Sequence, residues 1–147
     1  MDFDTNVKLT IYNVIAETTR APTSAEIAQM LDSSVEEIEA AFERLYRKRL
    51  LVVEPNDSSR IRMAPPFSGI ETPFLVRVGK KSYYANCAWD ALGISAALHA
   101  DADIFASDAH THEPLTLLVR DGNPVPVPCV THFAVPAARW WDDIIYT

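Results

Sequence analysis

The sequence predicts an α+β protein, in which a winged-helix-like unit of three helices and a β-hairpin precedes a small mixed β-sheet unit with one central helix. Three observations lead to this fold class. Two capping-box motifs mark helix starts in the N-terminal third, a hairpin pattern follows them, and short alternating segments occupy the second half. We therefore divide the chain into residues 1–64, the winged-helix-like unit, and residues 65–147, the α+β unit.

The N-terminal unit is predicted from helix signals and one turn. A first helix is expected over residues 7–18, ending before Pro22, with one side formed by Leu9, Tyr12, Ile15 and Ala16. The motifs "TSAE" (23–26) and "SVEE" (34–37) place a hydroxyl and a glutamate where each can bind a free N–H group of a helix start. Two more helices are therefore predicted. "LLVVE" and "RIRMA", separated by the polar "PNDSS", then predict a hairpin.

The second unit is predicted from alternation and from turn residues. "MAPPFSG" (63–69) is rich in turn formers and is expected to link the units. "FLVRV" alternates, Gly79 offers a turn, and "SYYA" leads into an apolar helix. "DADIFAS", "LTLLVRD" and "THFAV" predict further short strands. Proline cannot donate to a strand ladder, so "NPVPVPC" is expected at an edge or in a loop.

The composition is that of an ordinary globular protein. Of 147 residues, 48% are apolar and 22% charged, with a net charge of −7, which is enough apolar material to bury a core. No apolar run reaches the roughly 18 residues of a membrane span, and "MDFDTNVKLT" lacks a signal-peptide pattern. We therefore expect a cytoplasmic protein with no membrane partner. In that reducing compartment its two cysteines are expected to be free thiols.

Cys87 and Asp90, in "YYANCAWDALGISAAL", are the candidates for chemistry. Asn86 is a good N-cap, which would place Cys87 at the first helical position and Asp90 one turn later on the same face. Free N–H groups and the helix dipole favour a thiolate there, whereas the carboxylate opposes it, so the pair would hold one proton between them. A small buried cysteine and a first-turn carboxylate that complements the dipole also fit this spacing.

The segment "YYANCAWDALGI", followed by "DADIFASDAHTHEPLTLLVRDG" and "VPAARWWDDI", resembles the alkylmercury lyases, the organomercurial-cleaving enzymes of mercury-resistant bacteria. The resemblance implies that Cys87 binds the mercury of the substrate or of the Hg(II) product, and that Asp90 passes a proton to the departing carbanion. It also implies no resident cofactor, with small-molecule thiols as co-reactants. The chemistry is consistent, because soft mercury prefers thiolate and a neighbouring acid can supply the proton.

The resemblance further implies a second cysteine, which a count onward from "VPAARWW" places near the C-terminus, where this chain has Thr147. The other thiol, Cys129, lies before that point, and we do not transfer the role to it because free cysteine often serves as a small hydrophobe. A shortened or divergent member of the family is therefore expected. The alternative left open is a non-catalytic, thiol-based metal-binding or sensing protein.

Two other sites and one aromatic pair are candidates for function. His110 and His112, with Asp108 and Glu113, are metal-ligand types in a stretch where a turn is expected. Six basic and three acidic residues between positions 42 and 62 would attract phosphate, as in a winged-helix transcriptional regulator, although the four glutamates of "SVEEIEAAFE" oppose it. In "RWWDD" (139–143) one tryptophan is expected in the core and the other over a neighbouring surface, with an apolar lid as the alternative.

Overall fold

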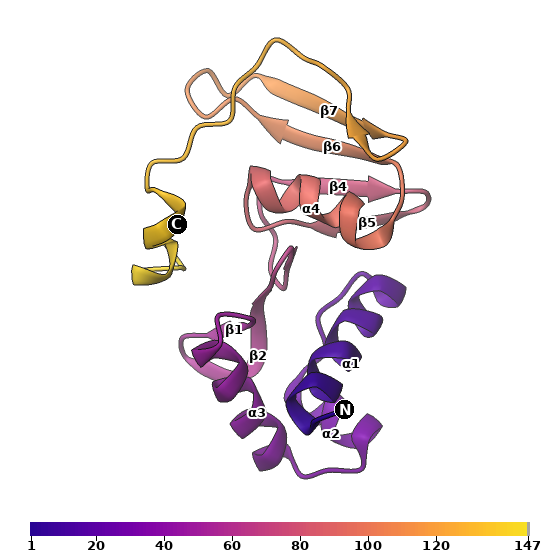
Figure 1. The fold of residues 1–147 in the computed structure, drawn as a ribbon, viewed down its shortest axis with the longest axis vertical. Helices are drawn as coiled ribbons and strands as arrows, with labels where there is room; N and C mark the ends of the chain where they lie inside the picture. Colours follow the sequence, from indigo (N-terminus) through magenta and orange to yellow (C-terminus); the bar gives the residue numbers. More distant parts are fainter. Residues whose placement is uncertain (147) are drawn as a thin grey trace.

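The computed structural model describes residues 1–146 and confirms the α+β class. Three helices and a small sheet form one end of the molecule, and a larger sheet with one helix forms the other (Figure 1). In chain order the elements are α1 (Phe3–Thr18), α2 (Ser24–Leu31), α3 (Val35–Arg47), β1 (Val52–Glu54), β2 (Asp57–Ala64), β3 (Phe67–Ser68), β4 (Leu75–Val78), β5 (Lys81–Tyr84), α4 (Ala88–Leu98), β6 (Ala102–Ser107), β7 (Pro114–Arg120), β8 (Asn123–Pro124) and the 3₁₀ helix η1 (Ala137–Asp142).

Both predicted capping boxes are present. The side chains of Thr23 and Ser34 accept hydrogen bonds from the backbone N–H groups three residues later, at the starts of α2 and α3. Glu26 and Glu37 accept in return from the backbone N–H groups of the two caps. Four N–H groups that would otherwise lack helical partners are thereby satisfied, which is why the chain enters both helices where the motifs predict.

Helix α1 begins earlier than predicted and turns a different face to the core. Asp2 caps it by accepting from the Thr5 N–H group at 3.1 Å, so the helix starts before residue 7. The buried side chains follow a spacing of three or four residues and are those of Asp4, Val7, Ile11 and Ile15. The predicted face is therefore correct for Ile15 and wrong for Leu9, whose side chain is 43% exposed.

The predicted hairpin is the β1–β2 pair, to which β3 adds a third antiparallel strand. Strand β1 is shorter than expected, because residues 50 and 51 precede it without pairing. Three helices followed by a hairpin match the predicted order of the first unit, and the boundary at residue 64 stays a prediction.

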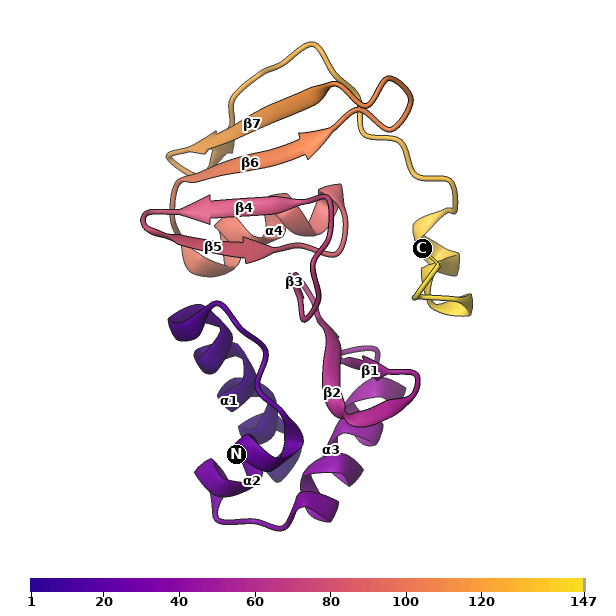
Figure 2. The ribbon, with the colours of Figure 1, turned by 180° about the vertical axis from the view of Figure 1, so that it is seen from behind.

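The second sheet has the strand order β5-β4-β6-β7-β8, and every described pair in it is antiparallel, which corrects the expectation of a mixed sheet. Helix α4 covers one face, while the opposite face is open (Figures 1 and 2). Val76 and Ile104 pair across β4 and β6 and are fully buried. The proline-rich stretch forms the edge strand β8, as expected, but residues 131–135 are irregular rather than a strand.

One hydrophobic core runs through both ends of the molecule. Phe67 of β3 packs between Tyr12 of α1 and Tyr83 of β5, with ring centroids 6.1 and 5.5 Å away. The Tyr83 hydroxyl donates to the carbonyl of Ala16, at 2.7 Å, near the end of α1. Residues from far apart in the sequence are therefore held together where β3 meets α1 and β5. Within residues 1–146, no helix is long and apolar enough to cross a membrane.

Candidate functional site: a thiol and a carboxyl at the start of α4

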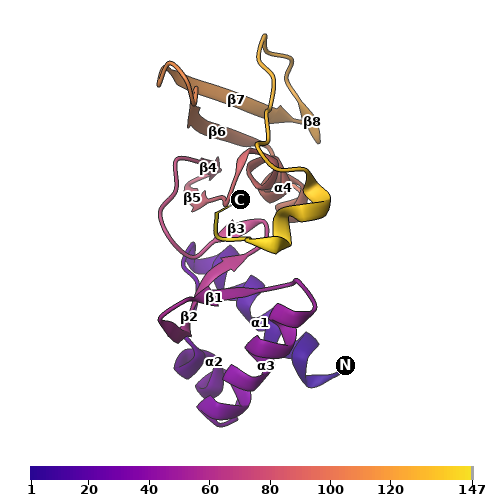
Figure 3. The ribbon, with the colours of Figure 1, turned by 90° about the vertical axis from the view of Figure 1, so that its left-hand side faces the viewer.

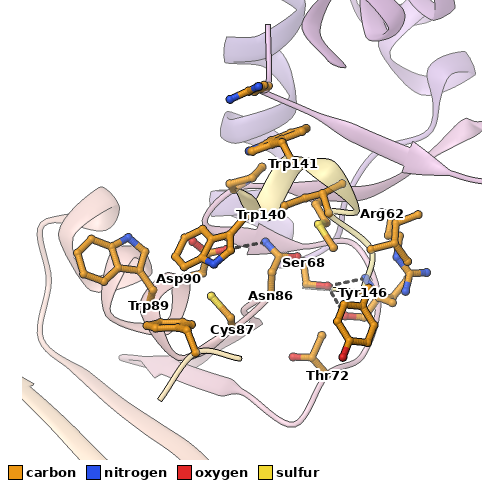
Figure 4. Close-up of a pocket in the computed structure, with 17 residues that line it drawn as sticks. Arg62, Ser68, Thr72, Asn86, Cys87, Trp89, Asp90, Trp140, Trp141 and Tyr146 are labelled. Atoms are coloured by element: carbon orange, nitrogen blue, oxygen red, sulfur yellow. Dashed lines mark hydrogen bonds between the residues drawn. The ribbon is translucent and has the colours of Figure 1, made fainter. Parts of the chain in front are cut away.

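The start of α4 opens into a cavity of about 370 Å³, and both predicted site residues, Cys87 and Asp90, line it (Figure 4). Its walls come from the end of β2, the segment around β3, the first turn of α4 and the C-terminal segment 133–146. The C-terminal segment reaches this position by crossing back over the junction between β3 and α4 (Figure 3). The thiol and the carboxyl are therefore brought together in one cavity.

The local position of Cys87 differs from the prediction by one residue. Helix α4 begins at Ala88, so that Cys87 itself is the N-cap, with an extended backbone at φ −157°. Its thiol makes no capping hydrogen bond of normal geometry. Asn86, the predicted cap, lies outside the helix, and its side chain bonds to Phe67 O and Asp90 Oδ2 instead of capping the helix. A thiol at an N-cap is near the free N–H groups without being held by them.

Burial raises the pKa of the half-buried Cys87 thiol, and the negative charge of Asp90 raises it further. The backbone N–H groups of Asp90 and Trp89 favour the thiolate but are outweighed. The influence of the helix start is present with its expected sign, but removal of the sulfur from water opposes charge more strongly than the N–H groups stabilise it. Burial therefore favours the protonated form of the Cys87 thiol, which must lose its proton to bind a metal.

Burial also raises the pKa of the Asp90 carboxyl. The opposing influence is a hydrogen bond that Asp90 Oδ2 accepts from Asn86 Nδ2 at 2.9 Å. The same nitrogen donates to the backbone carbonyl of Phe67 at 3.2 Å. Burial therefore disfavours charge on either group, so that a carboxylate at this position readily takes up a proton as the neighbouring thiol loses one.

A second thiol does not line this cavity in the described part of the chain. Its sulfur atoms there belong to Cys87 and Met63. Cys129 is exposed in the irregular segment after β8 and is not among the lining residues. Thr147, where the second cysteine was expected, lies outside the described residues.

The histidine-containing stretch forms the turn that was expected there. Asp108 Oδ1 accepts from the N–H groups of His110 and Thr111, at 2.8 and 2.7 Å. Among the described residues, no group of three or more His, Cys, Asp or Glu side chains could hold a metal ion. The metal-site alternative at His110 and His112 is therefore wrong for this conformation.

Aromatic side chains form much of the cavity wall. Trp140 and Trp141 are both half-buried and both line the cavity, so neither enters the core as expected of one of them. Trp140 packs on Phe133, with ring centroids 5.1 Å apart, and its indole N–H donates to the carbonyl of Val135 at 2.8 Å. Trp89, two residues after the thiol, is the wall residue that sequence reasoning missed, and it is 63% exposed.

Much of the positive charge between residues 42 and 62 is paired within the chain. Arg44 and Lys48 contact Asp4 of α1, at 2.7 and 3.2 Å. Arg62 pairs with Glu54 at 3.2 Å. This pairing reduces the charge available to phosphate groups, and nucleic-acid binding stays a prediction.

The comparisons with known proteins agree with this geometry. Comparison with curated proteins gives no match. A solved crystal structure, of the mercury-bound form of MerB2, is similar with a TM-score of 0.68 and 25% sequence identity; the match covers 86% of this chain and 60% of that chain. This chain therefore spans less than two thirds of the solved one. The family model for alkylmercury lyase matches residues 67–147, more than half of the sequence and all of the cavity wall from β3 onward. The chain belongs to the alkylmercury lyase family.

Proposed function

We propose that this protein cleaves the carbon–mercury bond of organomercurials by protonolysis, with Cys87 binding mercury and Asp90 delivering the proton. The observation that carries the proposal is that the two side chains line one cavity, where burial raises the pKa of both. Family membership supports the general activity. The roles given to Cys87 and Asp90 are part of this proposal.

In the first step, the sulfur of Cys87 binds the mercury of R–Hg–X. A sulfur–mercury bond forms, X leaves as an anion, and the thiol proton passes to the Asp90 carboxylate. Asp90 already raises the pKa of the thiol through its charge, so the two groups are close enough to interact. Soft mercury compensates for the loss of the proton, because its affinity for thiolate is high.

In the second step, Asp90 gives its proton to the carbon atom bound to mercury. The electron pair of the carbon–mercury bond forms the new carbon–hydrogen bond, and R–H departs. Hg(II) stays on the sulfur of Cys87, and a small-molecule thiolate takes the position that carbon leaves. A second small thiol then releases the metal. The small thiol is assigned this part because Cys87 is the only cysteine lining the described cavity.

The aromatic wall suits an apolar organic group. Trp89 and Trp140 lie on the same side of the cavity as the thiol (Figure 4), and Phe133, which packs on Trp140, also lines it. Such a wall favours a hydrocarbon over water, and water excluded from the site cannot take the proton that Asp90 holds.

Release of benzene from phenylmercury acetate tests the proposal. The protein is incubated with this compound and an excess of free cysteine, and benzene is measured by gas chromatography. We expect release by the wild type and by Cys129→Ser, and none by Cys87→Ser. Wild-type release no greater than that of Cys87→Ser would contradict the proposal, and loss in Cys129→Ser would show that Cys129 supplies the second thiol.

Binding of Hg(II) without turnover is the second candidate function, favoured by the single cysteine in the described cavity wall. Titration with Hg(II) while free thiols are counted separates it from catalysis. Loss of the Cys87 thiol at one equivalent, without benzene release in the assay above, is its expected result. Retention of both free thiols would contradict it.

A further inference from the structure

The side-chain amide of Asn86 joins the carboxyl of Asp90 to the backbone of β3 (Figure 4). One nitrogen, Nδ2, donates both hydrogen bonds, to Phe67 O and to Asp90 Oδ2. Asn86 also lines the cavity beside Cys87. It therefore lies between the proposed acid and a fixed part of the protein.

The carbonyl of Phe67 decides which way this amide faces. A carbonyl oxygen can only accept, so the atom placed against it must be the nitrogen of the amide and not its oxygen. Phe67 is 2% exposed, pairs with Ala64 of β2 and forms a bridge with Ala85. Its carbonyl is thus held rigidly, and the amide orientation does not depend on whether Asp90 carries a proton.

The oxygen at the other end of the Asn86 amide has a different environment from Nδ2. Asn86 Oδ1 is buried and has no hydrogen-bond partner among the described residues. A buried oxygen without a donor is destabilising. The orientation nevertheless satisfies two hydrogen bonds of Nδ2, whereas a flipped amide would place Oδ1 against two acceptors.

We propose that Asn86 is the positioning residue for proton transfer, because its amide occupies Asp90 Oδ2 and confines the transferable proton to Oδ1. This inference rests on the proposed function. In a neutral carboxyl the carbonyl oxygen is a better acceptor than the hydroxyl oxygen, so the hydrogen bond from Asn86 to Oδ2 favours the proton on Oδ1. When that proton moves to carbon and the carbon–mercury pair becomes the carbon–hydrogen bond, the carboxylate left behind keeps the Asn86 hydrogen bond.

Single-turnover kinetics test this role. Asn86→Ala removes both contacts, and Asn86→Asp keeps the size of the side chain while replacing the N–H donor. The variants are loaded with phenylmercury, and loading is followed as loss of the Cys87 thiol before benzene release is timed. We expect loading within about twofold of wild type and release slowed about tenfold or more, since misplacement of a reacting group by about 1 Å can cost about 100-fold. Tyr83→Phe, which also removes one side-chain hydrogen bond to a backbone carbonyl, is the matched control and should keep wild-type release.

Equal release rates in Asn86→Ala and wild type would overturn the proposal, as would equal slowing in Tyr83→Phe. A second measurement does not need turnover. In ¹⁵N-labelled protein, the Asn86 side-chain amide protons should shift in Asp90→Ala, because one of their acceptors is gone. An unchanged amide signal would overturn the pairing. Absence of benzene release from the wild type would instead contradict the proposed function, while the amide signal would still report on Asn86 and Asp90.

Discussion

Trp141 of η1 packs edge-on against Tyr46 of α3, with ring centroids 6.0 Å apart and an interplanar angle of 60°. Trp141 also lines the cavity that holds Cys87, whereas Tyr46 does not. One wall of the cavity is therefore anchored on the helical end of the molecule, although the thiol and the carboxyl belong to the other end (Figure 3). Helices α1, α2 and α3 supply no lining residue of this cavity within residues 1–146, and the contact with Tyr46 joins its wall to α3.

Tyr46→Ala should expose Cys87 without altering the cavity lining. Aromatic pairs contribute about 0.5–1.5 kcal/mol beyond the area they bury, so loss of this pair should open the C-terminal segment more often. We expect Cys87 to react with a thiol reagent roughly 2- to 10-fold faster, with a small change in melting temperature. Cys129, which is exposed in both proteins, serves as the internal reference. Unchanged reactivity of Cys87 would show that the contact does not hold the wall closed.

Asp90→Asn should abolish turnover and stabilise the fold at neutral pH. Removal of a general acid lowers rates by about 10²–10⁴-fold. Burial raises the pKa of Asp90, so the folded protein binds a proton at pH values where the unfolded chain has released it. Below the ordinary pKa of an aspartate, the carboxyl is neutral in the folded and the unfolded wild type. Ionisation of Asp90 then makes no difference between the stabilities of the wild type and Asp90→Asn. As pH rises through the raised pKa, the wild type should lose stability relative to Asp90→Asn, and above it the difference should be constant.

Thermal unfolding of both proteins between pH 3 and pH 8 checks this sign. A melting-temperature difference that grows with pH is the expected result. A difference that shrinks as pH rises would mean that the charged carboxylate is stabilised in the fold, in conflict with its burial.

The elements that local chemistry determines could be predicted from the sequence. Thr23 with Glu26, and Ser34 with Glu37, bind backbone groups within three residues, so their motifs sufficed to locate α2 and α3. The buried face of α1 could not be found in this way. It depends on packing against α3, where Asp4 meets Arg44 forty residues away.

The residues of the site could be predicted from the sequence, but their burial and their contacts could not. Spacing and family resemblance singled out Cys87 and Asp90, and the structure places both in one cavity. The net direction of the Cys87 pKa could not be deduced from local spacing, because burial dominates it and the cavity around the thiol is built from segments distant in the sequence. The same holds for Asn86, whose partner Phe67 lies nineteen positions earlier in the chain.

Trp89→Ala should discriminate between organic groups. Its ring is 63% exposed at the cavity, two positions from the thiol, so it can contact the substrate at little loss to the core. A stacked aromatic pair is worth about 0.5–1.5 kcal/mol, which corresponds to roughly 2- to 10-fold in affinity. We expect KM for phenylmercury to rise by this factor while KM for methylmercury changes less than twofold. Equal changes for both substrates would mean that Trp89 shapes the cavity but does not contact the aryl group.

Gly69→Ala should destabilise the protein and disturb the cavity wall together. A Cβ atom at Gly69 would lie 2.0 Å from the carbonyl oxygen of Ile61, which is backbone and cannot move aside. Gly69 also donates to the Arg62 carbonyl at 2.8 Å, and its neighbours Ser68 and Ile70 line the cavity. We expect a loss of about 3 kcal/mol in the free energy of unfolding, the upper end for overpacking, measured by urea denaturation.

Gly79→Ala is the matched comparison for this prediction. Gly79 has φ +60° and nothing within 4 Å of an added Cβ, so alanine there meets backbone strain without a collision. A left-handed conformation costs a non-glycine residue about 1–2 kcal/mol. Gly69→Ala should therefore be the more destabilising of the two, and it alone should slow benzene release. Equal losses of stability, with equal release rates, would mean that the segment around β3 can shift away from Ile61 without disturbing the cavity.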